Sequence, residues 1–405
     1  MKSARHTIVL AALLAGVVCT AAASAGQQAA TAGPTYKVVG KWGKDGSGNG
    51  QFTAAKGIAV DKAGNVYVAD TDNHRVQVFS KAGAFLRKWG SQGDGNGQFE
   101  IAEDVEIAPN GTVWVADQQN VRLQAFSASG AFQTSIGLPS DELPRAVGVA
   151  ADGSVLAAAN GEERSGFRRW VEKPTGWEAV GGLLGAGDYR ADEVEGSPDG
   201  TIYLVTNRNE APYDARIRRY TVDGKALGSF KRSDNNVGIG VDLDCNVWSP
   251  DHPNRRIVKY SPSGKVLATA AIPDLVANDI AVGPTGDVYV LKQSPQEVVH
   301  FAEDAKKPAT ANVPGRIVVS KGKAAVKYVG SGFACPEQVD ATFTLKGAGV
   351  SGKGTAKVAA GKATTLQMSV NGPVGKTVKA TFTIVLKTNG RPTTETKSVQ
   401  VSFAK

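Results

Sequence analysis

Residues 56–80 read KGIAVDKAGNVYVADTDNHRVQVFS, and they contain three short β-strand patterns separated by turn residues. The segments GIAVD, NVYVAD and RVQVF are rich in β-branched and aromatic residues, which favour strands. Gly64 lies between the first two segments, where a tight hairpin turn needs a positive φ. The stretch therefore predicts an antiparallel meander.

The second strand and its turn recur along the chain at intervals of 47, 42, 47, 45 and 41 residues. A short strand precedes each copy, and a third and a fourth strand, such as AFLRKWG at 84–90, follow most of them. Six repeats of four antiparallel strands are therefore predicted. The copies are GNVYVAD from Gly64, GTVWVAD from Gly111, GSVLAAA from Gly153, GTIYLVT from Gly200, CNVWSPD from Cys245 and GDVYVLK from Gly286.

Sheets of this size have two apolar faces, and radial stacking around an axis covers every face with a neighbour. Residues 56–80 resemble the repeat of the NHL family. The resemblance implies an all-β fold with a six-bladed β-propeller of the NHL or six-bladed TolB-like type over residues 34–303. The last repeat lacks a fourth strand, whereas TYKVVGKWG at 35–43 is an unpaired strand. We expect this N-terminal strand to complete the last sheet and close the ring.

Two glycine-rich stretches, WGKDGSGNGQF at 42–52 and WGSQGDGNGQF at 89–99, precede the first strand of a repeat. A phosphate-binding loop would continue into a helix, which the sequence does not predict here. Asp45, Ser47 and Asn49 match early positions of a calcium loop, but Lys56 stands where its bidentate glutamate belongs. We interpret both stretches as connections between neighbouring sheets.

An aspartate and an arginine five residues apart recur at the turn between the second and third strands of three repeats. A carboxylate and a guanidinium at this separation can form an ion pair that holds the turn. We interpret the pairs as structural. They are Asp70 with Arg75, Asp117 with Arg122, and Asp251 with Arg256.

The first strand of each repeat should lie innermost, so its side chains alternate between the neighbouring sheet and the axis. Six residues before each turn the sequence is always apolar: Ile58, Val105, Val147, Val194, Ile239 and Ile280. The positions on either side should face the channel and hold five acids: Asp104, Glu106, Glu193, Glu195 and Asp279. Such a cluster either stays hydrated or binds a cation, and calcium suits an all-oxygen site. Arg145 and Lys56 lie one step nearer the mouth and offer partial neutralisation.

The sequence favours a module that is not an enzyme. NHL-type propellers include peptidylglycine amide lyases with a zinc held by histidines, and related propellers include lactonases and streptogramin lyases. Past the N-terminal segment this chain has three histidines, His74, His252 and His300, at different places of the repeat. They are not expected to ligate one zinc ion. A calcium-dependent lyase or hydrolase that uses an axial carboxylate stays open as the alternative.

The chain begins with Lys2 and Arg5, a short apolar run, and Ala23-Ser24-Ala25. This pattern predicts a signal peptide over residues 1–25, cleaved near Ala25 and Gly26, and a secreted, extracytoplasmic protein. Lipid attachment to Cys19 would generally need a small residue directly before it, and Val18 is there. We therefore expect the protein to be released and not anchored by a lipid. Beyond Cys19 the cysteines are Cys245 and Cys335, for which we expect two buried thiols over one bridge.

Charge divides the chain. Residues 313–405 hold 14 Lys and Arg against 3 Asp and Glu, a net charge of +11. Residues 1–25 carry +2 of the total of +8, which leaves −5 for the repeats between them. An acidic propeller argues against nucleic-acid binding, which some NHL domains perform. The basic segment suits an anionic cell-wall polymer or membrane surface, or the acidic propeller itself.

After a linker over residues 304–314, alternating strand patterns predict an immunoglobulin-like β-sandwich over residues 315–405. No segment past the N-terminal region is apolar for long enough to cross a membrane. The sequence thus predicts an exported interaction module whose propeller loops bind a protein or peptide ligand. It assigns no certain cofactor.

Overall fold

The computed structural model describes residues 35–161, 164–187, 189–207, 215–232 and 238–303 of the repeat region. In the C-terminal region it describes residues 316–320, 323–329, 339–347, 349–358, 363–371, 377–388 and 391–403. The predicted signal peptide and linker lie outside these ranges. In the described part of the chain, no helix has the length and apolar character needed to span a membrane.

The strands of the repeat region form six antiparallel sheets. The first three contain β2 (Gly57–Val60), β3 (Val66–Asp70), β4 (Arg75–Phe79) and β5 (Phe85–Trp89); β6 (Ala102–Ile107), β7 (Val113–Asp117), β8 (Arg122–Phe126) and β9 (Phe132–Gly137); and β10 (Leu143–Val149), β11 (Val155–Asn160), β12 (Ser165–Lys173), β13 (Gly176–Ala179) and β14 (Leu184–Gly187).

The next two sheets contain β15 (Arg190–Gly196), β16 (Ile202–Asn207), β17 (Arg216–Tyr220) and β18 (Ala226–Lys231); and β19 (Gly240–Val241), β20 (Val247–Asp251), β21 (Arg256–Tyr260) and β22 (Val266–Ala271). The last contains β23 (Ala277–Val282), β24 (Val288–Gln293), β25 (Gln296–Glu303) and β1 (Tyr36–Trp42). A 3-10 turn, η1 (Thr71–Asn73), links β3 to β4.

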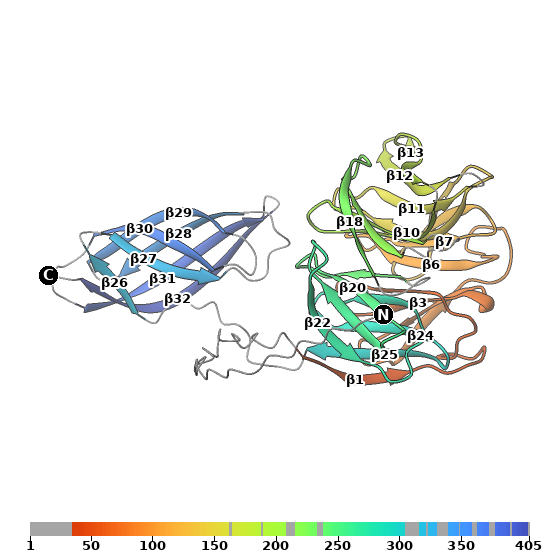
Figure 1. The fold of residues 1–405 in the computed structure, drawn as a ribbon, viewed down its shortest axis with the longest axis horizontal. Coiled ribbons are helices and arrows are strands. Elements are labelled where there is room, and N and C mark those ends of the chain that lie inside the picture. The colour runs from red at the N-terminus through yellow and green to blue at the C-terminus, as the bar shows by residue number, and fades with distance from the viewer. Residues whose placement is uncertain are drawn as a thin grey trace, which may run out of the picture. The chain divides into compact units, whose positions relative to one another are not determined.

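The first strands of the repeats lie at the centre of a ring. Strands β2, β6, β10, β15, β19 and β23 contact one another in this order, and β23 contacts β2 again. Figure 1 shows the sheets carrying β6, β10 and β18 on one side of the ring and those carrying β3, β20 and β24 on the other. The all-β propeller fold is therefore as the repeats predict.

Strand β1 closes the ring, as the sequence predicts. It pairs antiparallel with β25, from Tyr36 opposite Glu303 to Trp42 opposite Val298, and it lies beside β25 in Figure 1. The last sheet thus takes its outermost strand from the start of the described chain and its other three from the end of the repeat region. Closure by pairing leaves no gap between the last sheet and the first.

Each boundary between sheets is filled by apolar side chains. The six positions predicted to face a neighbouring sheet are all buried: Ile58, Val105, Val147, Val194, Ile239 and Ile280 are at most 3% exposed. They belong to separate clusters that join one sheet to the next. The predicted direction of the intervening side chains, toward the axis, follows from this alternation.

Cys245 occupies the turn position where most repeats have glycine. Its φ of 56° lies in the left-handed region, as do the φ angles of Gly64 and Gly111 at the equivalent turns. Cys245 is buried and disulfide-bonded, so the expectation of a free thiol is wrong for this residue. The turn tolerates a side chain at a position that favours glycine. Cys19 and Cys335 lie outside the described residues.

The C-terminal strands form one closed ring of pairings in the order β26, β27, β30, β29, β28, β31, β32. Strand β26 pairs antiparallel with β27 and parallel with β32. Because one sheet closes on itself here, the two separate sheets of the immunoglobulin-like sandwich are not confirmed. The strands are β26 (Arg316–Ser320), β27 (Lys323–Val329), β28 (Val339–Gly347), β29 (Val350–Val358), β30 (Ala363–Asn371), β31 (Thr377–Thr388) and β32 (Arg391–Phe403).

Deleting residues 35–43 should destabilise the whole ring, because the deletion removes β1 and exposes the edge of β25. We expect the thermal unfolding midpoint to fall and the protein to lose its cooperative transition. The control is Val39→Thr, a change on the same strand at a side chain that is 48% exposed, which should leave the midpoint unchanged. An unaltered transition in the deletion variant would show that the ring closes without β1.

Candidate functional site

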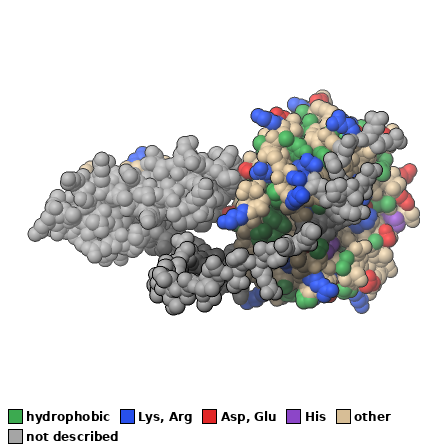
Figure 2. Space-filling view, in the orientation of Figure 1, with side chains coloured by type: hydrophobic (Ala, Val, Ile, Leu, Met, Phe, Trp, Pro, Cys, Tyr) green, Lys and Arg blue, Asp and Glu red, His purple; other side chains and the backbone are tan. Residues whose placement is uncertain are grey.

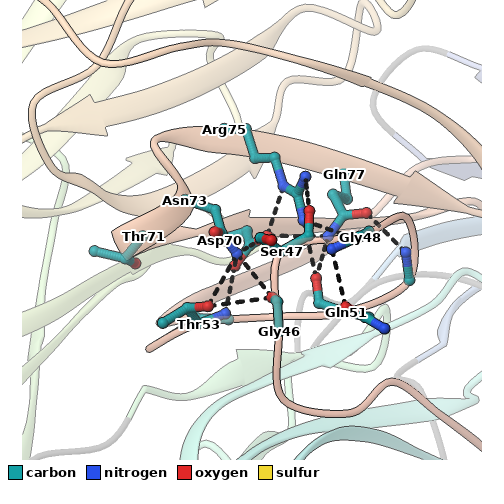
Figure 3. Close-up of polar contacts among 12 residues, drawn as sticks. Gly46, Ser47, Gly48, Gln51, Thr53, Asp70, Thr71, Asn73, Arg75 and Gln77 are labelled. Atoms are coloured by element: carbon teal, nitrogen blue, oxygen red, sulfur yellow. Dashed lines mark hydrogen bonds and ion pairs between the residues drawn. The ribbon is translucent and has the colours of Figure 1, made fainter.

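The first glycine-rich loop is held by one buried arginine. The Arg75 guanidinium donates to the backbone carbonyls of Ser47 at 2.8 Å, Gly48 at 2.8 Å and Gln51 at 3.1 Å (Figure 3). These carbonyl oxygens accept from a cation that belongs to the protein, so the loop does not present them to a calcium ion. The geometry favours a structural connection between sheets.

Asp70 organises the contacts around this arginine. Its carboxylate is fully buried and accepts from Arg75 Nε at 2.7 Å, from the Thr53 amide at 2.8 Å and from Asn73 and Gln77 at 3.0 Å (Figure 3). A buried carboxylate is stable only with such partners. The sequence between β3 and β4 therefore fixes both its own turn and the glycine loop that precedes β2.

All three predicted ion pairs form, with different degrees of burial. The Arg to Asp distances are 2.7 Å for Arg75, 2.8 Å for Arg122 and 2.7 Å for Arg256. Their side chains are 8%, 15% and 42% exposed, respectively. Arg122 repeats the loop contacts by donating to the carbonyls of Gly95 and Gln98. We refer to this aspartate, arginine and glycine-loop arrangement as the loop clamp.

The innermost strands carry β-bulges at the end of the ring that bears the glycine loops. In β6, β10, β15 and β23 the pairing skips one residue: Glu103, Arg145, Asp192 and Asn278, respectively. An extra residue in a strand re-aims its side chain. Two consecutive side chains, such as Glu103 and Asp104, therefore reach the same cavity.

Three of the five predicted axial acids meet at the centre of the ring. Carboxylate oxygens of Asp104, Glu193 and Asp279 lie within 4.8 Å of one another, and all three residues are buried. Asp104 accepts from the amides of Val105 and Val147, and so joins the second sheet to the third. Asp279 accepts in the same way from Ile280 and Ile58, across the closure of the ring. We call these three residues the axial triad.

The other two predicted acids, Glu106 and Glu195, lie two residues farther along the same strands. They line a second cavity of about 400 Å³ together with apolar residues such as Val60 and Val149. Burial, and next the Asp104 carboxylate, raise the pKa of Glu106 to about 8. Burial and the nearby Glu106 raise the pKa of Glu195 well above its usual value. The structure thus brings all five acids to one channel.

The axial triad shares this electrostatic environment. Burial raises the pKa of Asp104 to about 7, against the opposing effect of its two backbone hydrogen bonds. Burial and then the Asp104 charge raise the pKa values of Glu193 and Asp279 well above their usual range. Among the described residues, none of the five acids has a cationic partner. The channel therefore attracts protons or a cation.

Unlike the axial acids, the charged residues at and beside the bulges form ion pairs with one another. Lys56 pairs with Glu103 at 2.6 Å, and Arg145 lies 3.6 Å from Glu103 and 3.5 Å from Asp192. Arg190 also pairs with Asp192, at 2.6 Å. Lys56 and Arg145 therefore pair with Glu103 and Asp192 at the mouth of the channel. From the sequence we expected them to neutralise part of the axial acids instead.

The sequence interpretation missed Glu103, Asp192 and Asn278. They occupy the position eight residues before each turn, where Lys56 and Arg145 also lie. This column is polar in five of the six repeats, with Val237 as the exception in the fifth, and this is the signal that identifies it. We call the cavity that they line with Asp104 and Glu193 of the axial triad the axial cavity. Its volume is about 520 Å³. Asp45 and Gly46 of the first glycine loop also line it, as does Thr53, which directly follows that loop.

The histidines lie outside the channel, as the repeat alignment predicts. His74 Nδ1 contacts the Glu100 carbonyl at 2.8 Å, and His252 Nε2 accepts from the Ala277 amide. His300 Nε2 lies 3.0 Å from Asp287. Separate partners at separate places leave no shared histidine site for a zinc ion among the described residues.

A family model described as NHL repeat matches residues 52–79, which cover β2, β3 and β4. The B-box type zinc finger protein ncl-1 of Caenorhabditis elegans is 53% identical over 45 residues, which are 11% of this chain and 5% of that protein. The protein brain tumor of Drosophila melanogaster is 49% identical over 45 residues, 4% of its length. The similarity thus spans a small fraction of these relatives.

The chain carries an NHL repeat within a β-propeller fold. Among solved structures, the propeller is similar to a streptogramin B lyase, with 12% identity, a TM-score of 0.46 and coverage of 66% of this chain and 98% of that one. A gluconolactonase of Xanthomonas campestris has 13% identity, a TM-score of 0.47 and coverage of 62% and 87%. At these identities the likeness says nothing about substrate.

The buried loop clamp should contribute more to propeller stability than its exposed copy. Arg75→Ala leaves the buried Asp70 without its cation and frees the glycine loop, so we expect a loss of about 3–5 kcal/mol. Arg256→Ala is the comparison, because the Arg256 side chain is 42% exposed although its partner Asp251 is buried, and we expect a smaller loss than for Arg75→Ala. Chemical denaturation measures both. Equal losses would contradict the role that we assign to burial and loop contacts.

Proposed function

We propose that the propeller is an interaction module that presents its glycine-loop face to a protein or peptide ligand. NHL repeats generally mediate protein interactions, and this supports the class of function. The observation that carries the proposal is the loop clamp, which fixes two adjacent loops at one end of the ring. Loops fixed before binding lose little conformational entropy when a partner docks.

The same face surrounds the axial cavity, because Asp45 and Thr53 line that cavity together with Asp104 and Glu193. In Figure 2 the visible Asp and Glu side chains of the ring are scattered among Lys and Arg. The axial acids, in contrast, are concentrated inside the ring. A ligand on the glycine-loop face therefore meets its strongest charge feature at the axis.

The proposal places the protein outside the cytoplasm. The leader pattern of residues 1–25 supports export. The net charge of +11 over residues 313–405 supports attachment to an anionic cell-wall polymer or membrane surface, weakened by salt. A net charge of −5 on the repeat region supports a partner other than nucleic acid.

A second candidate function is supported by the axial triad alone. Three converging carboxylates suit a divalent cation such as calcium, which prefers oxygen ligands. A metal-dependent lyase or hydrolase would then use a neighbouring axial carboxylate as its base, for which a raised pKa is favourable. The axial triad does not indicate which substrate such an enzyme would use, and this function does not involve the loop clamp.

Charge reversal on the glycine loops should abolish ligand capture. We expect residues 26–405 with Asp45→Arg and Asp94→Arg, both on exposed loop positions, to capture at least tenfold less partner from an envelope extract. The control is Asp223→Arg, an exposed change in the turn between β17 and β18 at the other end of the sheets. Quantified pull-down measures both. Equal capture by the loop variant and the parent would contradict the proposed face.

A further inference from the structure

The axial cavity combines access from the glycine-loop face with buried carboxyl groups that have no cationic partner among the described residues. Its volume of about 520 Å³ falls in the range of ligand sites. Its lining includes the ion-paired residues Lys56, Glu103 and Arg145, together with Asp104 and Glu193 of the axial triad. A ligand that enters therefore meets acids without a cation.

We propose that the axial cavity binds a primary ammonium group of the peptide ligand, carried by a lysine side chain or by the N-terminal amine. This inference rests on the proposed function and names the chemistry that the glycine-loop face recognises. It makes the axis the specificity site of the propeller. The fixed loops around the mouth hold the rest of the ligand.

The geometry of the axial triad matches this group. For any three points within 4.8 Å of one another, a point exists within 4.8/√3, or about 2.8 Å, of all of them. A nitrogen at that point lies at charge-assisted hydrogen-bond distance from one oxygen of each acid. An ammonium group has three N–H donors that radiate from one atom, whereas a guanidinium is a planar fork. The triad therefore discriminates lysine from arginine.

The Glu193 carboxylate offers one oxygen to a ligand in the axial cavity. Its side chain is more than nine-tenths buried and lines the axial cavity. Oε1 accepts from the Val194 amide at 3.0 Å, but Oε2 has no hydrogen-bond donor among the described residues. This oxygen lies beside the space at Gly238, which lines the same cavity, so an ammonium group there can donate a charge-assisted hydrogen bond to it.

The absence of a side chain at Gly238 keeps this oxygen accessible. A Cβ there would lie 1.8 Å from Asp279 Oδ1 and 3.0 Å from Glu193 Oε2. Gly57 has the same relation to Asp104, with a Cβ placed 2.4 Å from its Oδ1. The two glycines thus create the space in which the triad converges. Glu106 and Glu195, beyond the triad, add to the attraction for a cation.

Isothermal titration calorimetry on residues 26–405 tests the inference with small probes at pH 8. Nα-acetyl-lysine N-methylamide carries the side-chain amine, and glycine N-methylamide carries the N-terminal amine. We expect at least one of them to bind, and the stronger probe identifies the source of the ammonium group. The arginine analogue should bind at least tenfold more weakly. Failure of both amine probes, or equal binding of the arginine analogue, would overturn the inference.

Two variants connect the binding to the triad. Glu193→Gln keeps the shape of the side chain and should weaken the amine probe at least tenfold without lowering thermal stability. Glu172→Gln changes an exposed carboxylate of β12 and should leave binding unchanged. Binding that Glu193→Gln does not weaken would overturn the inference. Binding of calcium chloride in place of both amines would also overturn it and would support the metal candidate.

The failure of the proposed function has a different signature. If the loop reversals at Asp45 and Asp94 leave envelope capture unchanged while the amine probe still binds through Glu193, the glycine-loop face is not the docking surface. The ammonium site then stands without it. If capture depends on the loops but no amine probe binds, the function stands and the inference fails.

Discussion

The pairing of β1 with β25 is the constraint on which the rest of the structure depends. Each sheet has two apolar faces, and a ring that is closed by hydrogen bonds gives every face a neighbour. Closure also forces the innermost strands around a narrow axis, where their inward side chains meet. The convergence of Asp104, Glu193 and Asp279, which come from three different sheets, is a consequence of this closure.

The axial acids impose a cost that the ring offsets only in part. Backbone amides of Val147 and Ile58 donate across sheet boundaries to Asp104 and Asp279, so these acids also join the sheets. Their raised pKa values mean that the folded state binds more protons than the unfolded chain above about pH 4. The stability that this protonation contributes is lost as the pH rises through the raised pKa values. Such a cost is typical of sites that are completed by a ligand.

The repeat period predicted the sheets, the closing strand, the loop-clamp ion pairs and the five acids, because all of these follow from strand alternation in a fixed frame. The bulges were not predictable, since one extra residue in β6 or β15 breaks that alternation without a distinctive sequence. The partners of Lys56 and Arg145 depended on the same bulges. The disulfide of Cys245 and the closed C-terminal sheet depend on contacts between distant segments, which period and composition do not specify.

The most direct test of the central claim is a titration of the side-chain carboxyl carbons by nuclear magnetic resonance, in the absence of divalent cations and amines. The account predicts midpoints of about 7 for Asp104 and about 8 for Glu106, well above the value of about 4 for a carboxyl group in an unstructured peptide. Midpoints near pH 4 for Asp104 and Glu106 would show that the channel acids are already compensated, and would contradict the account.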